Sequence, residues 1–305
     1  MNKLETLLRE TEIILADGAM GTMLFTAGLQ QGEPPQLWNI EHPERVAAVH
    51  HQYLEAGSKL LLTNTFSANL FRMASHDSKT SIAEINRTGA KILIDAIEAA
   101  GGNALAAGDI GPSGQVMAPY GELAFEEAKA GFIEQVEALI SAGVDVIWIE
   151  TMSDLEEVRA AFQATREISM EIPIITTLTF DTQGRTMMGV SPEQAVNTLT
   201  SLGASAVGGN CGRGPDEIIS VIEKMHAISP DTVLVAKANA GIPKIVAGKT
   251  VYEADPTTMA DYALQVRAAG AQIIGACCGS TPAHIKAMSE ALASHQNDGY
   301  HPSLP

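Results

Sequence analysis

Residues 145–168 read DVIWIETMSDLEEVRAAFQATREI and contain one complete strand-then-helix unit. Residues 145–149 form a short apolar run, which is typical of a strand that is covered on both faces of a sheet. A Ser-Asp dipeptide then precedes an amphipathic stretch over 155–168, and serine and aspartate are residues that cap the N-termini of helices. The polar residues between the two elements lie at the carboxyl end of the predicted strand.

The same unit recurs along the chain, which predicts a repeating α/β architecture. Amphipathic stretches lie between the apolar runs, and helix-start pairs such as Ser191-Pro192 and Thr281-Pro282 open several of them. Eight units favour a (β/α)8 TIM barrel in a single domain over 1–305. A doubly wound sheet is the alternative, because the sequence does not reveal strand order. The predicted strands are 12–16, 59–63, 104–108, 145–149, 174–179, 204–208, 232–236 and 271–275.

Composition and charge exclude several classes of protein. The chain has 305 residues, of which 46% are hydrophobic and 18% charged, so it can bury a large core. Its net charge of −17 disfavours nucleic acid and anionic membrane surfaces as partners. We find no signal peptide and no apolar run long enough to span a membrane. We therefore expect a cytoplasmic protein, with a flexible tail from about residue 294.

All three cysteines follow predicted strands at the same end of the predicted barrel. Cys211 follows the sixth strand, and the adjacent pair Cys277 and Cys278 follows the eighth. Three cysteines are too few, and odd in number, for a disulfide framework. Zn²⁺ takes thiolates in tetrahedral geometry, and three protein ligands leave one position for a substrate. The alternative is that the cysteines are simply small buried residues, and it accounts less well for three at equivalent positions.

Such a site favours thiol chemistry over hydrolysis. The sequence has no HExxH motif, and three thiolates make zinc a weak Lewis acid that holds a soft fourth ligand well. A substrate thiol bound there would ionise near neutral pH, whereas a free thiol has a pKa of about 8.5. We expect this sulfur to attack an electrophilic carbon, with no catalytic side chain beyond the activated substrate. The pair His50-His51 is expected on a helix surface rather than at a metal.

The segments at the predicted strand ends resemble the zinc-dependent homocysteine S-methyltransferase family. The resemblance covers roughly residues 15–293 and is most specific in the two cysteine motifs. The usual Gly-Gly-Cys-Cys-Gly of the family is Gly275-Ala276-Cys277-Cys278-Gly279 here, which leaves both cysteines in place. The other matching segments are Asp17-Gly18-Ala19-Met20-Gly21-Thr22, Ala56-Gly57, Thr63-Asn64-Thr65-Phe66, 145–151, Gly209-Asn210-Cys211, Lys237-Ala238-Asn239-Ala240-Gly241 and Thr281-Pro282.

The resemblance implies roles for individual residues. Zinc would be held by the three cysteines, with the sulfur of homocysteine as the fourth ligand. Asp17 and Glu150 would grip the ammonium group of the amino acid, and backbone N–H groups from Gly18 onward would take its carboxylate. Asn210 and Asn239 would contact the substrate or support the ligands, and structural roles in turns are the alternative for both.

The methyl donor is the part that the resemblance leaves open. Members of the family use methylcobalamin, betaine or sulfonium compounds, and this chain has no Asp-x-His-x-x-Gly cobalamin motif. We expect a small betaine-like quaternary-ammonium or sulfonium donor, held by cation–π contact with Trp38, and methionine as the product. One alternative is a separate methylated corrinoid protein that docks at the barrel mouth. Another is a non-catalytic zinc- or thiol-binding barrel, and assembly into a homo-oligomer is left open.

Overall fold

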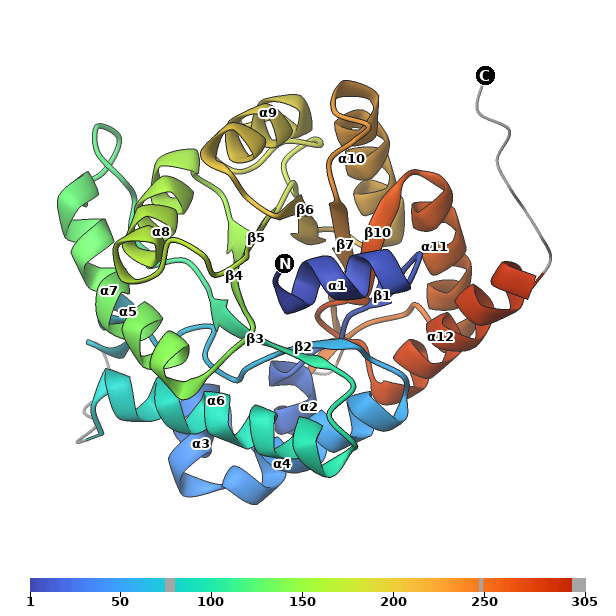
Figure 1. Ribbon diagram of the computed structural model, residues 1–305, viewed down its shortest axis with the longest axis horizontal. Coiled ribbons are helices and arrows are strands. Elements are labelled where there is room, and N and C mark those ends of the chain that lie inside the picture. The colour runs from blue at the N-terminus through green and yellow to red at the C-terminus, as the bar shows by residue number, and fades with distance from the viewer. Residues whose placement is uncertain (75–79, 247–248, 298–305) are drawn as a thin grey trace.

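The computed structural model describes residues 1–74, 80–246 and 249–297. Within these ranges eight parallel strands form a barrel (Figure 1). They are β1 (Ile14–Leu15), β2 (Leu60–Leu62), β3 (Leu105–Ile110), β4 (Val146–Met152), β5 (Ile174–Leu178), β6 (Ala206–Cys211), β7 (Leu234–Ala238) and β10 (Ala271–Ala276). Neighbouring strands follow the order β1-β10-β7-β6-β5-β4-β3-β2, and a bridge between Ala16 and Leu60 joins the two ends of this series. The predicted TIM barrel is confirmed, and the doubly wound sheet is wrong because the strands close into a ring in chain order.

Helices surround the barrel because each strand is followed by an amphipathic segment that can cover it. Ser191 and Gln194 form a capping box at the start of one helix, and Gly203 ends that helix in the left-handed conformation. The long helices are α4 (Pro43–Glu55), α6 (Ile82–Ala99), α7 (Phe125–Ala142), α8 (Leu155–Ile168), α9 (Pro192–Leu202), α10 (Pro215–Ile228), α11 (Pro256–Ala268) and α12 (Pro282–Asn297). Shorter helical segments are α1 (Lys3–Glu10), α2 (Gly21–Thr26), η1 (Pro35–Leu37), α3 (Trp38–Glu41) and α5 (Leu70–Met73).

The core has two main parts, one between the strands and the helices and one inside the barrel. The inner part contains Trp148 and Leu62, and it also contains Leu4 of α1. Figure 1 shows α1 lying across one end of the barrel. Leu4 packs against residues near the starts of the strands, so α1 closes the floor of the barrel. The carboxyl ends of the strands are left for chemistry at the opposite end.

Two features differ in extent from the sequence-based expectation. The loop after β7 contains an antiparallel hairpin, β8 (Lys244–Val246) and β9 (Lys249–Val251), which is additional to the eight predicted strands. The last helix continues to Asn297, so residues 294–297, which were expected in a flexible tail, are helical, and the rest of the predicted tail lies outside the described residues. None of the helices in the described part of the chain combines the length and apolarity needed to cross a membrane.

Candidate metal centre and substrate site

The three cysteine sulfurs meet at the carboxyl ends of β6 and β10. The Sγ atom of Cys211 lies 3.0 Å from that of Cys277 and 3.8 Å from that of Cys278. Cys211 has a φ of 60°, a backbone conformation that side-chain-bearing residues rarely adopt, and Gly212 follows with a φ of 66°. Strain of this kind is retained where the surrounding structure enforces it, as at a functional site. The convergence expected from the sequence is therefore present.

The donor set fits a thiophilic metal ion such as zinc. The three sulfur atoms all lie within 4.8 Å of one another, and no other described group of histidine, cysteine and acidic side chains is arranged in this way. Hydrogen bonds from Cys211 and Cys277 lower the pKa of Cys278 to about 3. The pKa of Cys211 is raised, because Cys211 is hydrogen-bonded to both Cys277 and Cys278. Without a cation the cluster therefore keeps at least one thiol protonated, and a divalent ion would allow all three to ionise.

Backbone hydrogen bonds hold the cysteine turn against β7. The N–H of Cys277 donates to the carbonyl of Ala238 over 2.7 Å, and the N–H of Ala240 donates to the carbonyl of Cys278 over 2.9 Å. Asn239 donates from Nδ2 to the carbonyl of Gly212 over 2.7 Å, and its buried Oδ1 has no hydrogen-bond partner in the described structure. Asn239 thus supports the turn after Cys211 and keeps a free acceptor buried at this end of β7.

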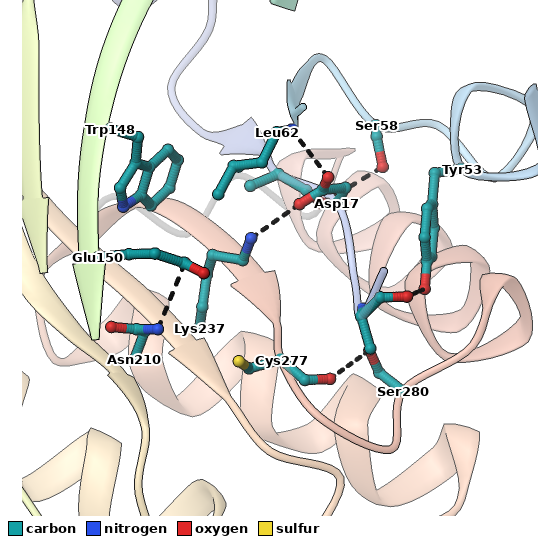
Figure 2. Close-up of polar contacts among 12 residues, drawn as sticks. Asp17, Tyr53, Ser58, Leu62, Trp148, Glu150, Asn210, Lys237, Cys277 and Ser280 are labelled. Carbon is teal, nitrogen blue, oxygen red and sulfur yellow. Dashed lines mark hydrogen bonds and ion pairs between the residues drawn. The ribbon is translucent and has the colours of Figure 1, made fainter. Parts of the chain in front are cut away.

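A layer of buried polar side chains lies inside the barrel next to Cys277 (Figure 2). Lys237 places its Nζ 2.7 Å from Oδ1 of Asp17 and 5.1 Å from the ring centroid of Trp148. The other oxygen of Asp17, Oδ2, accepts a 2.9 Å hydrogen bond from the N–H of Leu62. Burial raises the pKa of Asp17, and Lys237 opposes that shift. Asp17 is therefore held from two sides within the barrel.

Glu150 belongs to the same layer and lies beside Asn210. Asn210 donates from Nδ2 to Oε2 of Glu150 over 3.3 Å and to Oγ1 of Thr151 over 2.7 Å, and its Oδ1 accepts from the N–H of Thr151 over 2.9 Å. Burial raises the pKa of Glu150 to about 8. Asn210 thus orients Glu150 and fixes the turn at Thr151, which has a φ of 59°.

Asp109 and Lys237 are members of this layer that sequence reasoning did not assign to the site. Asp109 is buried, its Oδ1 atom has no hydrogen-bond partner among the described residues, and burial raises its pKa well above the usual range. The period-two pattern of strands was the available signal, because it puts Asp109 on the same face of β3 as Ala107 inside the barrel. Lys237 could have been found in the same way on β7.

The loop after β1 is packed tightly around Gly18. A Cβ atom at Gly18 would lie 2.6 Å from Oγ of Ser280 and 2.8 Å from the hydroxyl of Tyr53. Those two groups bind Ala19, because its N–H donates to Ser280 over 3.0 Å and its carbonyl accepts from Tyr53 over 2.8 Å. The loop is therefore fixed to α4 and to the cysteine turn, and Gly18 is the residue that lets the three segments approach.

Trp38 is buried among helices at the side of the barrel. The guanidinium carbon of Arg45 lies 5.0 Å from its ring centroid, and the ring of His42 packs edge-on against it at 4.8 Å. Both contacts of the Trp38 ring are with residues of this chain, so a contact between Trp38 and the methyl donor stays a prediction. The structure brings the other predicted site residues together near the cysteines, namely Asp17, Gly18, Glu150, Asn210 and Asn239.

Comparison with known proteins places the site in context. The sequence model of a family described as homocysteine S-methyltransferase matches residues 14–292. Methionine synthases from Mycobacterium leprae and Mycobacterium tuberculosis are 29% and 28% identical over 312 residues, which is 97% and 96% of this chain. The alignments cover 25% and 26% of those proteins, so the chain spans about a quarter of the length of the curated relatives it matches.

Solved structures are similar to the same family. The metallated form of the homocysteine methyltransferase MmuM from Escherichia coli superposes with a TM-score of 0.80 at 26% identity, over 95% of this chain and 99% of that one. A dihydrodipicolinate synthase from Bacillus anthracis matches with a TM-score of 0.53 at 12% identity, over 94% of this chain and 77% of that one, and shows the barrel fold alone.

Proposed function

The chain belongs to the homocysteine S-methyltransferase family, and from that premise we propose that it moves a methyl group from a small quaternary-ammonium or sulfonium donor to the sulfur of homocysteine, giving methionine. The observation that carries this proposal is the convergence of three cysteine sulfurs beside a buried layer of carboxyl groups. The sulfurs suit a thiophilic metal, and the carboxyl groups suit the ammonium end of an amino acid.

Cys211, Cys277 and Cys278 would hold the metal, which we propose is zinc. When bound, zinc would lower the pKa of the homocysteine thiol so that the thiolate exists near neutral pH. The side chains of the polar layer, including Glu150 and Asp17, orient the amino acid so that its sulfur points to the cysteines. The N–H groups of the loop from Gly18, apart from that of Ala19, which donates to Ser280, would face the substrate carboxylate.

The methyl transfer itself would need no proton-removing side chain. An electron pair on the homocysteine sulfur forms the new S–C bond, and the donor nitrogen or sulfur leaves with the electron pair of the bond that breaks. The surrounding residues therefore contribute position and the exclusion of water. Trp38 remains the proposed contact for a cationic donor. Arg45 now lies over the ring of Trp38, so it would have to move away for the donor to bind there.

A second candidate donor is a methylated corrinoid protein, and exposed apolar side chains at the barrel mouth favour it. Tyr120 is 83% exposed in the loop after β3, Met187 is 71% exposed in the loop after β5, and Ile245 is 81% exposed in the hairpin after β7. Loops that follow barrel strands share one face, so these side chains surround the end that holds the cysteines. Large exposed apolar side chains gathered on one face are typical of a protein-docking surface.

A donor screen tests both candidates. Zinc-loaded protein is given homocysteine and reductant with betaine, with S-methylmethionine, or with a methylated corrinoid protein, and methionine is measured. Methionine from betaine or the sulfonium alone supports the proposal. Methionine from the corrinoid protein only would replace it with the second candidate. Zinc binding without methionine from any donor would favour the non-catalytic barrel.

The variant Cys211→Ala tests the metal assignment. We expect bound zinc to fall from about one per chain to a small fraction and methyl transfer to be lost, because two thiolates hold zinc far less well than three. Ser201→Ala on the exposed end of α9 is the control and should keep both zinc and activity. Retention of zinc and activity by Cys211→Ala would contradict the assignment.

A further inference from the structure

Residues 252–254, which follow the hairpin of β8 and β9, form a short segment that packs against the cysteine turn. A Cβ atom at Gly279 would lie 2.1 Å from Cγ of Tyr252 and 2.5 Å from its Cβ, so the base of the tyrosine ring rests directly on the backbone of Gly279. The tyrosine side chain is also packed against the main hydrophobic core. Tyr252 and the turn after β10 can therefore lie this close because residue 279 has no side chain.

Two hydrogen bonds hold this segment in place. The N–H of Ala254 donates to the carbonyl of Ala240 over 3.0 Å. Nδ1 of His284 accepts from the N–H of Thr281 over 3.0 Å, so its Nε2 carries the ring proton and donates to the carbonyl of Ala254 over 3.0 Å. The backbone next to Tyr252 is thus tied both to the end of β7 and to the start of the last helix, and these ties fix where the tyrosine side chain lies.

The hydroxyl of Tyr252 reaches the sulfur of Cys278. It donates a hydrogen bond to Sγ of Cys278, whereas the Sγ atoms of Cys211 and Cys277 are hydrogen-bonded to sulfurs of the same cluster. A metal ion that binds three thiolates displaces the protons that the sulfurs share. The proton of the tyrosine belongs to its hydroxyl group and stays there. The hydrogen bond from Tyr252 to Cys278 is therefore one that persists when the cluster ionises.

The proposed reaction requires a choice between sulfurs. The thiolate of homocysteine would meet three protein thiolates at the metal, and all three cysteines are partly exposed. Every thiolate is a nucleophile, and methylation of a protein ligand would turn it into an uncharged thioether that binds zinc poorly. A hydrogen bond stabilises the negative charge of a thiolate, and that stabilisation is lost as the sulfur gives an electron pair to carbon. A thiolate that accepts a hydrogen bond therefore reacts more slowly.

We propose that Tyr252 protects Cys278 from methylation, so that the methyl group goes to the sulfur of homocysteine instead. This inference rests on the proposed function, because it concerns which sulfur receives the methyl group. In the reaction that is prevented, an electron pair of the Cys278 sulfur would form the S–C bond, and the donor would leave with the electron pair of the bond that breaks. Tyr252 is thus a positioning residue that acts through a metal ligand and determines selectivity.

Methylation by iodomethane tests the proposal without the natural donor. Zinc-loaded protein is treated with iodomethane in the absence of homocysteine, each sulfur that reacts gains a methyl group, and iodide leaves with the bonding electron pair. Peptide mapping by mass spectrometry gives the rate for each cysteine. In Tyr252→Phe, which keeps the ring on Gly279, we expect Cys278 to react about 3- to 30-fold faster than in the wild type, as for partial loss of one charged hydrogen bond. Cys211 and Cys277 should keep their rates and serve as internal references.

A matched variant and a second measurement make the test decisive. Tyr120→Phe removes the hydroxyl of a tyrosine that is 83% exposed, and its cysteines should react as in the wild type. Zinc content before treatment shows that the cysteine site of each variant is intact. In cobalt-loaded protein, the sulfur-to-cobalt charge-transfer band should move to longer wavelength in Tyr252→Phe, because a thiolate without the hydrogen bond gives up an electron more easily.

The outcomes separate this inference from the proposed function. An unchanged rate at Cys278 in Tyr252→Phe would overturn the inference, as would a cobalt band at the wild-type wavelength, because the hydroxyl would then not act on that sulfur. Equal acceleration at all three cysteines would also overturn it, since the whole site would then have loosened. None of these results depends on methionine formation. The proposed function fails separately, if zinc-loaded wild-type protein makes no methionine from homocysteine with any donor.

Discussion

Glu150 makes the stability of the protein depend on pH. Burial raises its pKa to about 8 from an ordinary value of 4.5, so the folded state binds the proton more tightly than the unfolded state does. Stability is therefore highest below the ordinary pKa and falls as pH rises from about 4.5 to about 8. The decrease is at most about 1.4 kcal/mol per pH unit. A carboxyl group kept for binding thus lowers stability at the pH where it is ionised.

We predict that Glu150→Gln is more stable than the wild type at pH 8, and that the difference is smaller at pH 6. The amide has no proton to lose, so it avoids the ionisation of a buried group. Urea unfolding of both proteins in the same reducing buffers measures the free energy of unfolding. Glu223→Gln on the exposed face of α10 is the control and should show no such pH dependence. A constant difference between pH 6 and pH 8 would contradict the prediction.

Gly18 and Gly21, both after β1, differ in the space around them and allow the effect of packing on stability to be tested. Gly18→Ala places a Cβ 2.6 Å from Ser280, so we expect a loss of about 1–3 kcal/mol in the free energy of unfolding and weaker homocysteine binding. Gly21→Ala has nothing within 4 Å and should be neutral or slightly stabilising. Chemical denaturation and homocysteine titration measure both effects. Equal behaviour of the two variants would mean that the loop does not need a glycine at Gly18.

At the scale of single residues, the sequence predicted much of the site, because reactive and polar residue types follow the predicted strands. The three cysteines converge as expected, and Asp17 and Glu150 lie close enough to Cys277 for its charge to raise their pKa values. Lys237 was not assigned a role: the alternation of side chains along β7 turns it into the barrel, but it gives no sign of the ion pair with Asp17 on another strand. His50 was expected at the surface and is fully buried, with burial lowering its pKa to about 3, so that expectation was wrong.

At the scale of elements, regular strand and helix units were predictable and additions to them were not. The barrel strands were found because each has a continuous apolar run between turn residues. The hairpin of β8 and β9 has only three residues in each strand, and its exposed Ile245 has no alternating pattern to mark it. Such short antiparallel strands take their stability from tertiary contacts, which a sequence pattern does not contain.

Helix α1 is an element whose role is structural and lies far from the chemistry. Leu4 is its buried residue and completes the inner core at the floor of the barrel. We predict that Leu4→Ala lowers the free energy of unfolding by about 2–5 kcal/mol and leaves zinc content and homocysteine affinity unchanged. Glu10→Ala on the exposed side of α1 is the control and should change stability by less than about 0.5 kcal/mol. A loss of homocysteine affinity in Leu4→Ala would show that the floor and the site are coupled.

At the scale of the whole molecule, the metal site joins two parts of the ring that are far apart in sequence. Cys211 ends β6, and Cys277 and Cys278 follow β10, with β7 between these strands in the sheet. An ion that binds the folded chain better than the unfolded chain stabilises it by about 4 kcal/mol at 1,000 times its dissociation constant. The same closeness of the sulfurs exposes the metal-free protein to oxidation, because nothing then separates the thiols.

We predict that peroxide converts the metal-free protein to a disulfide between Cys211 and Cys277, whose sulfurs are only 3.0 Å apart, and that zinc prevents this. Each disulfide releases two hydrogen atoms from the thiols, which reduce one hydrogen peroxide to two waters. Peptide mapping by mass spectrometry identifies the linked pair, and thiol titration should fall from three groups to one. The zinc-loaded protein under the same peroxide is the control. A disulfide between the adjacent Cys277 and Cys278 would contradict the prediction, because it would mean that the turn after β10 rearranges when the ion leaves.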